Sequence, residues 1–227
     1  MYNEEATART DTLIKIISLF TLVLLIIAFT SNPVSTGVGV GERAPPLAGK
    51  AYNGGGWVDY DLYDHIDLDW EEGNSSGTWF VLEFMDTDCP YCWNDAAPKM
   101  SDLQNAVKSD QWGRAPVEIL VVAVELQIEG HDSTRAEIEA FRDKNDGDGS
   151  FKCNSGRSPC STRDGGPHSF PYIDDLDRTL LRDWNIPGTP TYFIIQPNGI
   201  IAWSSTEANN YEILDAVAGL IPKEDSS

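Results

Sequence analysis

Apolar residues are distributed along the chain in one long run near the N-terminus and in several short runs further on. In the long run, residues 13–30, Lys15 is the only charged side chain. A helix of this composition is apolar on every face and nearly long enough to cross a bilayer. The pattern therefore predicts a transmembrane signal anchor over residues 13–30, preceded by a short N-terminus over residues 1–12. A cleaved signal peptide is the alternative, although the run is longer than a usual signal-peptide core and no A-x-A cleavage site follows it.

Basic residues orient the predicted anchor. Arg9 and Lys15 lie at or before its start, and the next basic residue is Arg43. Because basic residues stay on the cytoplasmic side, the N-terminus is expected in the cytoplasm and everything after about residue 31 outside it. The sequence thus predicts a single-pass membrane protein with an extracytoplasmic domain.

Polar and Gly-rich stretches divide the remainder of the chain. Residues 31–42 are small and polar and predict a tether between membrane and domain. The folded domain is expected over residues 43–222, followed by a short tail over 223–227. Residues 145–170, rich in Gly, Asp and Ser, predict a loop insertion within the domain.

Short runs rich in β-branched and aromatic residues predict strands. These runs cover residues 78–84, 117–125, 191–196 and 200–204. The second run is apolar almost throughout, as expected of a strand covered on both faces. Asn198-Gly199, between the last two runs, indicates a tight hairpin.

Helical spacing of apolar residues predicts helices over residues 90–107, 133–144, 177–185 and 210–221. Ser133 or Thr134 is the expected N-cap of the second helix. The last helix is amphipathic, and its expected buried face is formed by Ile213, Leu214, Val217 and Leu220.

The order of these elements, β-α-β-α-α-β-β-α, predicts the fold class. Two strands joined by a helix are expected to be parallel, whereas the final hairpin is antiparallel. The prediction is an α/β fold in which a mixed sheet is flanked by helices.

Charge and cysteine content narrow the function. The chain carries 16 Lys and Arg against 36 Asp and Glu, a formal net charge of −20. Such an acidic chain repels phosphate backbones, so no nucleic-acid partner is expected. The four cysteines are too few for a disulfide scaffold in 227 residues.

The first cysteine pair has the spacing of a redox centre. Cys89-Pro90-Tyr91-Cys92 stands between the end of a predicted strand and the start of a predicted helix. Free N–H groups and the positive dipole end at a helix N-terminus stabilise a thiolate at Cys89, and Pro90 suits the first helical position. Cys92 lies one turn away, so it can close a disulfide and resolve a mixed disulfide formed at Cys89.

Two other interpretations of this pair stay open. It could form a purely structural disulfide, or it could supply half of a zinc site completed by Cys153, Cys160 or His168. The second pair, Cys153 and Cys160, lies in the loop insertion. Outside the cytoplasm these two are expected to form a structural disulfide, with a secondary redox relay as the alternative.

Several segments together resemble one family. FVLEFMDTDCPYC, NIPGTPTYFIIQPNGIIAW and, more loosely, GERAPPLAGKAYNGGGWVDYDLYD are similar to segments of the thioredoxin superfamily, and most to membrane-anchored oxidoreductases of the TlpA/ResA type. The resemblance covers roughly residues 40–220 and implies a thioredoxin-like fold. It also implies thiol-disulfide exchange at the CPYC motif.

The resemblance implies roles for four further residues. Pro190 matches a cis-proline that faces the active-site disulfide, and Thr189 before it offers backbone groups to a substrate segment. Glu83 matches a buried acid that moves the proton of Cys92, and its alternative is a strand residue that faces solvent. Asp95 matches an acid near the thiols, and its alternative is an exposed helix residue.

One departure bears on Asp95. The family usually has a proline five residues after the second cysteine, whereas Pro98 comes six after Cys92. This spacing predicts a one-residue adjustment in the first helix and puts the match of Asp95 in question.

The predicted function is a membrane-anchored, extracytoplasmic thiol-disulfide oxidoreductase. Its expected partners are exported protein thiols or disulfides and a membrane electron donor, and no cofactor or metal is expected. A peroxidase is disfavoured because Thr87-Asp88-Cys89 lacks the T-x-x-C spacing. The alternative from another class is a non-catalytic thioredoxin-like binding module or metal carrier.

Overall fold

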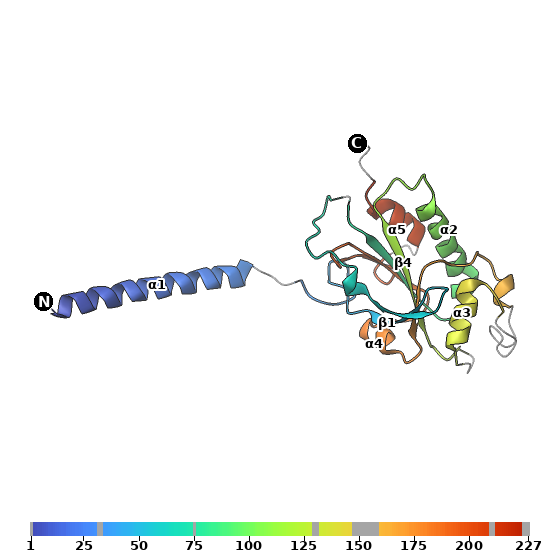
Figure 1. The fold of residues 1–227 in the computed structure, drawn as a ribbon, viewed down its shortest axis with the longest axis horizontal. Helices are drawn as coiled ribbons and strands as arrows, with labels where there is room; N and C mark the ends of the chain where they lie inside the picture. Colours follow the sequence, from blue (N-terminus) through green and yellow to red (C-terminus); the bar gives the residue numbers. More distant parts are fainter. Residues whose placement is uncertain are drawn as a thin grey trace. The chain divides into compact units, whose positions relative to one another are not determined.

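The computed structural model describes residues 2–30, 34–74, 76–128, 132–146, 159–208 and 212–223 (Figure 1). The chain divides into two compact units, Met1–Ser35 and Thr36–Ser227. Each unit is treated by itself below.

The first unit consists of one helix, α1 (Tyr2–Thr30). It extends beyond the predicted span of 13–30 and takes in residues 2–12 as well. Its large apolar side chains between Leu13 and Ile26 are exposed. Within the described residues, no helix combines the length and the apolar character needed to cross a membrane, so the predicted transmembrane helix is not supported.

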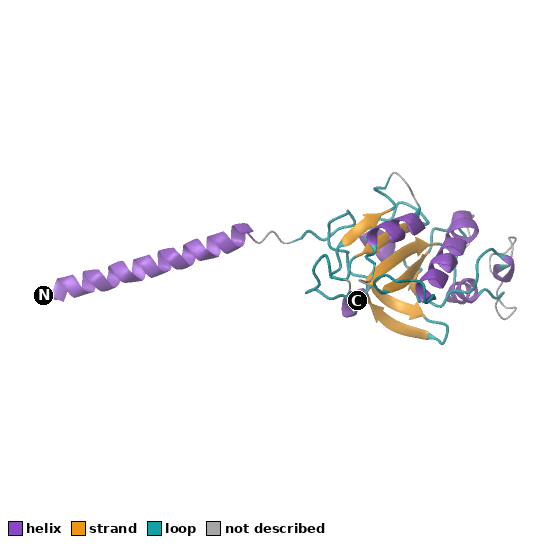
Figure 2. Ribbon diagram, turned by 90° about the horizontal axis from the view of Figure 1, so that it is seen from above, coloured by secondary structure: helices purple, strands orange, loops and turns teal. Residues whose placement is uncertain are grey.

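The second unit is built on a mixed sheet, whose strands are orange in Figure 2. The sheet has seven strands in the order β2-β1-β5-β4-β3-β6-β7. The central strands β3, β4 and β5 run parallel, and every other pairing is antiparallel. The strands are β1 (Ala48–Tyr52), β2 (Trp57–Asp61), β3 (Trp79–Met85), β4 (Val117–Val124), β5 (Tyr172–Asp175), β6 (Thr191–Ile195) and β7 (Ile201–Ser204).

The helices pack on both faces of the sheet. The α-helices are α2 (Ala97–Lys108), α3 (Arg135–Asp143), α4 (Thr179–Asp183) and α5 (Ile213–Leu220). Short turns of other helix types are η1 (Leu62–Asp64), η2 (Cys92–Ala96) and η4 (Cys160–Thr162). Apolar residues of α2, α3 and α5 join one core cluster, whereas those of η1 and α4 join the other.

Strand β3 separates the two clusters because its side chains alternate between the faces. Val81 and Met85 belong to the α2 side, and Phe80, Leu82 and Phe84 to the opposite side. All seven residues of β3 are buried. This central position holds the loop that follows β3, and therefore the cysteine motif, on a rigid support.

Most predicted elements are confirmed. The four predicted strands correspond to β3, β4, β6 and β7, and the parallel and antiparallel pairings are as expected. Thr134 is the N-cap of α3 and forms a capping box with Glu137. On α5, Ile213 and Val217 are buried as predicted, but Leu220 is 39% exposed, so that part of the prediction is wrong.

Three strands were not predicted. β1 reads AGKAY and β5 reads YIDD, so neither shows a clear run of β-branched or aromatic residues. The pattern of β2, WVDYD, is stronger, but β2 pairs only with β1. Pairing across the sheet, rather than local sequence, creates these strands.

The segment predicted as a tether is attached to the domain over much of its length. Gly37 donates its backbone N–H to the Arg43 carbonyl at 3.0 Å, and Gly41 donates to the Ile201 carbonyl at 2.8 Å. The second compact unit accordingly begins at Thr36. Much of the predicted loop insertion, residues 147–158, lies outside the described residues.

Candidate active site

The cysteine motif lies where the β3 loop enters a helix. Cys89 and Cys92 are both free thiols, and they are 4% and 0% exposed. The Cys92 N–H donates to the Cys89 carbonyl at 3.0 Å, which places both residues in one helical turn. Tyr91, between them, is 72% exposed and marks the motif on the surface.

The helix after the motif contains an extra residue. Cys92–Ala96 form a turn of π-helix, in which the Ala97 N–H donates to the Cys92 carbonyl. Pro98 then stands in the first turn of α2, where a missing N–H does no harm. The one-residue adjustment predicted from the position of Pro98 is therefore present, as a π-turn.

The two thiols differ strongly in acidity. A hydrogen bond from the Cys92 thiol, assisted by the backbone N–H groups of Cys92 and Tyr91, lowers the pKa of Cys89 to about 6 against the opposing effect of burial. Burial raises the pKa of Cys92 well above its usual value. At neutral pH, Cys89 is therefore largely ionised, while Cys92 holds its proton.

Glu83 lies beneath the motif on β3 and is 2% exposed. Burial and the nearby charge of Cys89 raise the pKa of its carboxyl to about 8. Glu83 pairs with Val121 on one side and Tyr192 on the other, and these two belong to the core cluster that contains both cysteines. Its side chain therefore points toward the thiols rather than into solvent.

The peptide bond between Thr189 and Pro190 is cis, as the resemblance implied. The Cys89 sulfur lies 3.3 Å from the Thr189 carbonyl oxygen, so this peptide bond lies against Cys89. A shallow pocket adjoins it, lined by Pro187, Gly188, Thr189, Pro190, Thr191, Ser205 and Thr206.

Asp95 lies in the π-turn that begins at Cys92. Its side chain is 60% exposed and forms an ion pair with Lys99 at 3.1 Å. The π-turn adds a residue in the segment that carries Asp95. The exposure and the ion pair fit the alternative of an exposed helix residue, and the role implied for Asp95 stays a prediction.

Two of the residues considered for a zinc site, Cys160 and His168, have other partners. Cys160 is disulfide-bonded, and Cys153, its predicted partner, lies outside the described residues. In the described part of the chain, no three His, Cys, Asp or Glu side chains are arranged to hold a metal ion.

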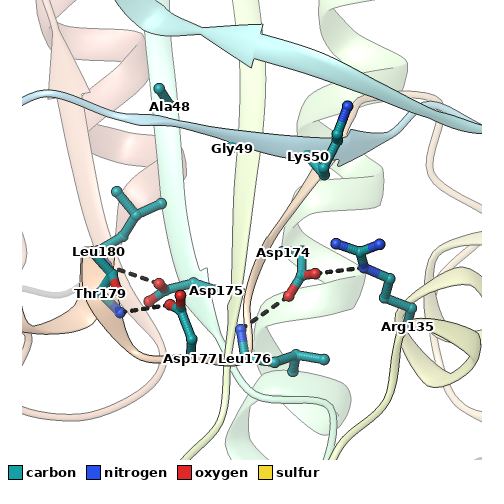
Figure 3. A pocket seen from close by; sticks show the side chains of 10 residues that line it. All are labelled: Ala48, Gly49, Lys50, Arg135, Asp174, Asp175, Leu176, Asp177, Thr179 and Leu180. Carbon is teal, nitrogen blue, oxygen red and sulfur yellow. Dashed lines mark hydrogen bonds and ion pairs between the residues drawn. The ribbon is translucent and has the colours of Figure 1, made fainter.

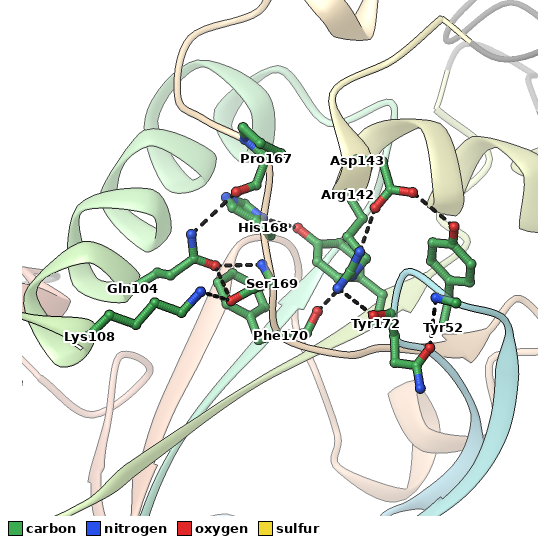
Figure 4. Close-up of polar contacts among 12 residues, drawn as sticks. Tyr52, Gln104, Lys108, Arg142, Asp143, Pro167, His168, Ser169, Phe170 and Tyr172 are labelled. Atoms are coloured by element: carbon green, nitrogen blue, oxygen red, sulfur yellow. Dashed lines mark hydrogen bonds and ion pairs between the residues drawn. The ribbon is translucent and has the colours of Figure 1, made fainter.

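His168 instead has a structural environment (Figure 4). Its Nδ1 lies 2.6 Å from the Tyr172 hydroxyl, and its Nε2 lies 3.1 Å from the Ala97 carbonyl. Burial lowers its pKa to about 4, so the ring is neutral. His168 thereby joins β5 to the start of α2.

Sequence reasoning missed Arg163, which belongs to the loop insertion and is 6% exposed. Its Nη1 donates to the Thr87 carbonyl at 3.2 Å, and its guanidinium lies 4.8 Å from the centre of the Trp93 ring. Arg163 thus contacts the chain on both sides of the motif. No sequence signal indicates these contacts, because Arg163 is about seventy residues away from its partners in the chain.

A larger pocket lies away from the cysteines, between β1 and the loop after β5 (Figure 3). Arg135 Nε and Asp174 Oδ2 form an ion pair there at 2.6 Å. The Asp175 and Asp177 side chains accept backbone hydrogen bonds at the start of α4. The polar groups of this pocket are thus largely engaged with each other.

Comparisons with known proteins agree with this geometry. The AhpC/TSA family matches residues 40–204. A search of the curated proteins finds no match.

Among solved structures, a reduced 2-Cys peroxiredoxin from Plasmodium vivax matches with a TM-score of 0.51 and 15% identity, covering 79% of this chain and 94% of that one. A putative thiol:disulfide interchange protein DsbE from Chlorobium tepidum matches with a TM-score of 0.45 and 18% identity, covering 74% and 85%. The thioredoxin domain of a Bacteroides vulgatus thiol-disulfide oxidoreductase matches with a TM-score of 0.47 and 15% identity, covering 82% and 99%. The first of these likenesses shows a shared fold.

Proposed function

We propose that this chain, which belongs to the AhpC/TSA family and is a thiol-disulfide oxidoreductase, exchanges disulfides with exported proteins through Cys89 and Cys92. The observation that carries the proposal is the pair of free, buried thiols in one helical turn beside a cis-proline. Their opposite pKa shifts support the roles proposed here, Cys89 as the nucleophile and Cys92 as the resolving thiol.

The first step forms a mixed disulfide. The Cys89 thiolate attacks one sulfur of a client disulfide, the client S–S bond breaks, and the departing client thiolate takes a proton from solvent. The cis-proline pocket supports this step, since the backbone groups of Thr189 stand beside Cys89 and can pair with an extended client segment.

The second step releases the client and needs a base. Once Cys89 is bonded to the client it carries no charge, so the charge that helps to raise the pKa of Glu83 is gone. Glu83 then ionises more readily and accepts the Cys92 proton. The Cys92 thiolate attacks the Cys89 sulfur, the bond between Cys89 and the client breaks, and the Cys89–Cys92 disulfide forms. The second client sulfur leaves as a thiolate and takes a proton from solvent.

Both electrons stay on sulfur throughout, so the proposed reaction needs no bound cofactor. Run in reverse, the same steps place a disulfide in a client, and the redox potential of the pair decides the direction. For the reductive direction, the proposed electron donor is a membrane-bound reductase that restores the two thiols.

Location outside the cytoplasm is part of the proposal. It is supported by the disulfide at Cys160, because such bonds persist in oxidising compartments. Membrane attachment through α1 is supported by its exposed apolar side chains between Leu13 and Ile26. Carbonate extraction tests membrane attachment, and release of the protein from the membrane would contradict it. Protease treatment of intact cells tests the location, and a domain that is protected from the protease would contradict it.

Disulfide exchange with insulin tests the activity, using the full chain in mild detergent with dithiothreitol as electron donor. We expect the wild-type chain to accelerate insulin reduction and Cys89→Ser to abolish that acceleration. We expect Cys92→Ser to accumulate a mixed disulfide. Glu71→Gln, at an exposed position, is the control and should react like the wild type.

Two outcomes would overturn the proposal. Hydrogen peroxide consumption that exceeds thiol exchange would identify a peroxidase. Absence of exchange, together with one bound metal ion per chain that Cys89→Ser loses, would identify the binding module.

A further inference from the structure

Tyr192 carries a buried hydroxyl that the proposed reaction has not yet used. Tyr192 is 5% exposed, and its hydroxyl oxygen has no hydrogen-bond partner within the described residues. A phenylalanine would fill the same apolar space without burying a polar group. A buried hydroxyl without a partner therefore calls for an explanation.

The sheet register places Tyr192 directly beside Glu83. The Tyr192 N–H donates to Ser205 Oγ at 2.9 Å, and the Ser205 N–H donates to the Tyr192 carbonyl at 2.9 Å. Both backbone groups of Tyr192 are thus directed away from β3, so Glu83 and Tyr192 form a non-hydrogen-bonded pair. In such a pair the side chains are on the same face and their Cβ atoms are about 4.5–5.5 Å apart.

The groups that face this pair are few. In the sheet, Glu83 on β3 and Tyr172 on β5 are separated by β4, which places the apolar Val121 between them. The Tyr172 hydroxyl is already bonded to His168. The titratable groups whose charges act on Glu83 or Tyr192 are Cys89, Cys92, Asp95 and Tyr172.

We propose that Tyr192 is a positioning residue for the resolving step, in which its hydroxyl donates a hydrogen bond to the Glu83 carboxylate. This inference rests on the proposed function, because it needs Glu83 to act as the base. A hydrogen-bond donor stabilises a neutral Glu83 carboxyl only weakly, and in that state the Tyr192 hydroxyl has no partner among the described residues. When Glu83 is ionised in the mixed disulfide, the donor stabilises the anion that takes the Cys92 proton.

The proton balance leaves Tyr192 unchanged. The Cys92 S–H bond breaks, its proton moves to a Glu83 oxygen, and the sulfur electron pair forms the bond to Cys89. The bond between Cys89 and the client breaks at the same time, and the client sulfur leaves as a thiolate. Tyr192 keeps its own proton, in agreement with the raised pKa that burial and the charge of Glu83 give its hydroxyl.

The test isolates the resolving step. The reduced full chain, in mild detergent, reacts with an aromatic disulfide whose released thiolate is coloured. The first release reports attack by Cys89, and the second reports attack by Cys92 on the mixed disulfide. The rate of the second release is measured between about pH 5 and pH 9 for the wild type and for Tyr192→Phe, Tyr172→Phe and Glu83→Gln.

We expect Tyr192→Phe to slow the second release about tenfold near neutral pH and to raise the midpoint of its pH profile by about one unit, since a hydrogen bond to a charged group is lost. The first release should be unchanged. Tyr172→Phe is the matched control, because its hydroxyl serves His168, and it should keep the wild-type midpoint.

The variants separate the two ideas. If Glu83→Gln removes the midpoint but Tyr192→Phe leaves it in place, the role of Tyr192 is refuted and the base role of Glu83 stands. If Glu83→Gln keeps the wild-type profile, the base itself is refuted. If Tyr192→Phe and Tyr172→Phe move the midpoint equally, the effect is structural and the inference fails.

Discussion

Replacement of Glu83 by glutamine should make the protein more stable at neutral and alkaline pH. The gain in free energy of unfolding depends on how far burial raises the pKa of the Glu83 carboxyl. The folded protein holds this carboxyl at a pKa of about 8 instead of its ordinary 4.5. Between these values the unfolded chain loses the proton and the folded chain keeps it. The free energy of unfolding of the wild type therefore falls by about 1.4 kcal/mol per pH unit across this window.

The sign and the window follow from the raised pKa. Below about pH 4.5 the Glu83 carboxyl is neutral in the folded and in the unfolded chain, so it causes no loss of stability there. Above that pH the loss in free energy of unfolding grows, until the carboxyl of the folded chain ionises near pH 8. At pH 7 it amounts to about 3 kcal/mol. Glutamine has nearly the same shape and no charge, so Glu83→Gln lacks this dependence.

Urea denaturation of the reduced chain at several pH values measures the difference between wild type and variant. We expect the variant to gain stability relative to the wild type from about pH 5 upward, by about 3 kcal/mol at pH 7. Glu71→Gln, at an exposed position, should show no such trend. A difference between wild type and Glu83→Gln that does not change with pH would refute the buried, protonated carboxyl.

Three further predictions concern the surroundings of the motif. Alkylation of the reduced chain by iodoacetamide should reach half its maximal rate near pH 6 and modify Cys89 but not Cys92, whereas a midpoint near pH 9 would contradict the stabilised thiolate. Asp95→Asn should change the rate of insulin reduction less than about twofold and the free energy of unfolding by less than about 0.5 kcal/mol, because its ion pair is exposed. Arg163→Leu should lower the free energy of unfolding by about 1–3 kcal/mol, because it removes the hydrogen bond to the Thr87 carbonyl and the contact with the Trp93 ring. An unchanged urea midpoint would count against those contacts.

The part of the fold that the sequence predicts is the part built from local signals. β3 and β4 are long apolar runs, the hairpin is marked by Asn198-Gly199, and α3 has its capping residue in sequence. β1 and β5 are short, and they exist because each pairs with a neighbour distant in the chain. Such pairing leaves little trace in the residues of either strand.

The same division holds at the site. The pair of thiols is predicted by the spacing of the cysteines, and the cis-proline and the buried Glu83 are implied by the resemblance of the surrounding segments to the thioredoxin superfamily. The place of Asp95 is harder to predict, because the extra residue that the position of Pro98 indicates falls in the turn that carries it. Tyr192 and Arg163 reach the site through strand register and loop packing, which spacing in the sequence does not reveal.

The central claim is that Cys89 and Cys92 form a reversible dithiol–disulfide couple. The most direct test equilibrates the full chain with glutathione and dithiothreitol couples, traps the thiols and identifies each cysteine pair by mass spectrometry. We expect the two thiols to convert to one disulfide and back as a single two-electron transition, while Cys160 stays oxidised. A pair that shows no such transition across the range from strongly reducing to strongly oxidising buffers would contradict the account.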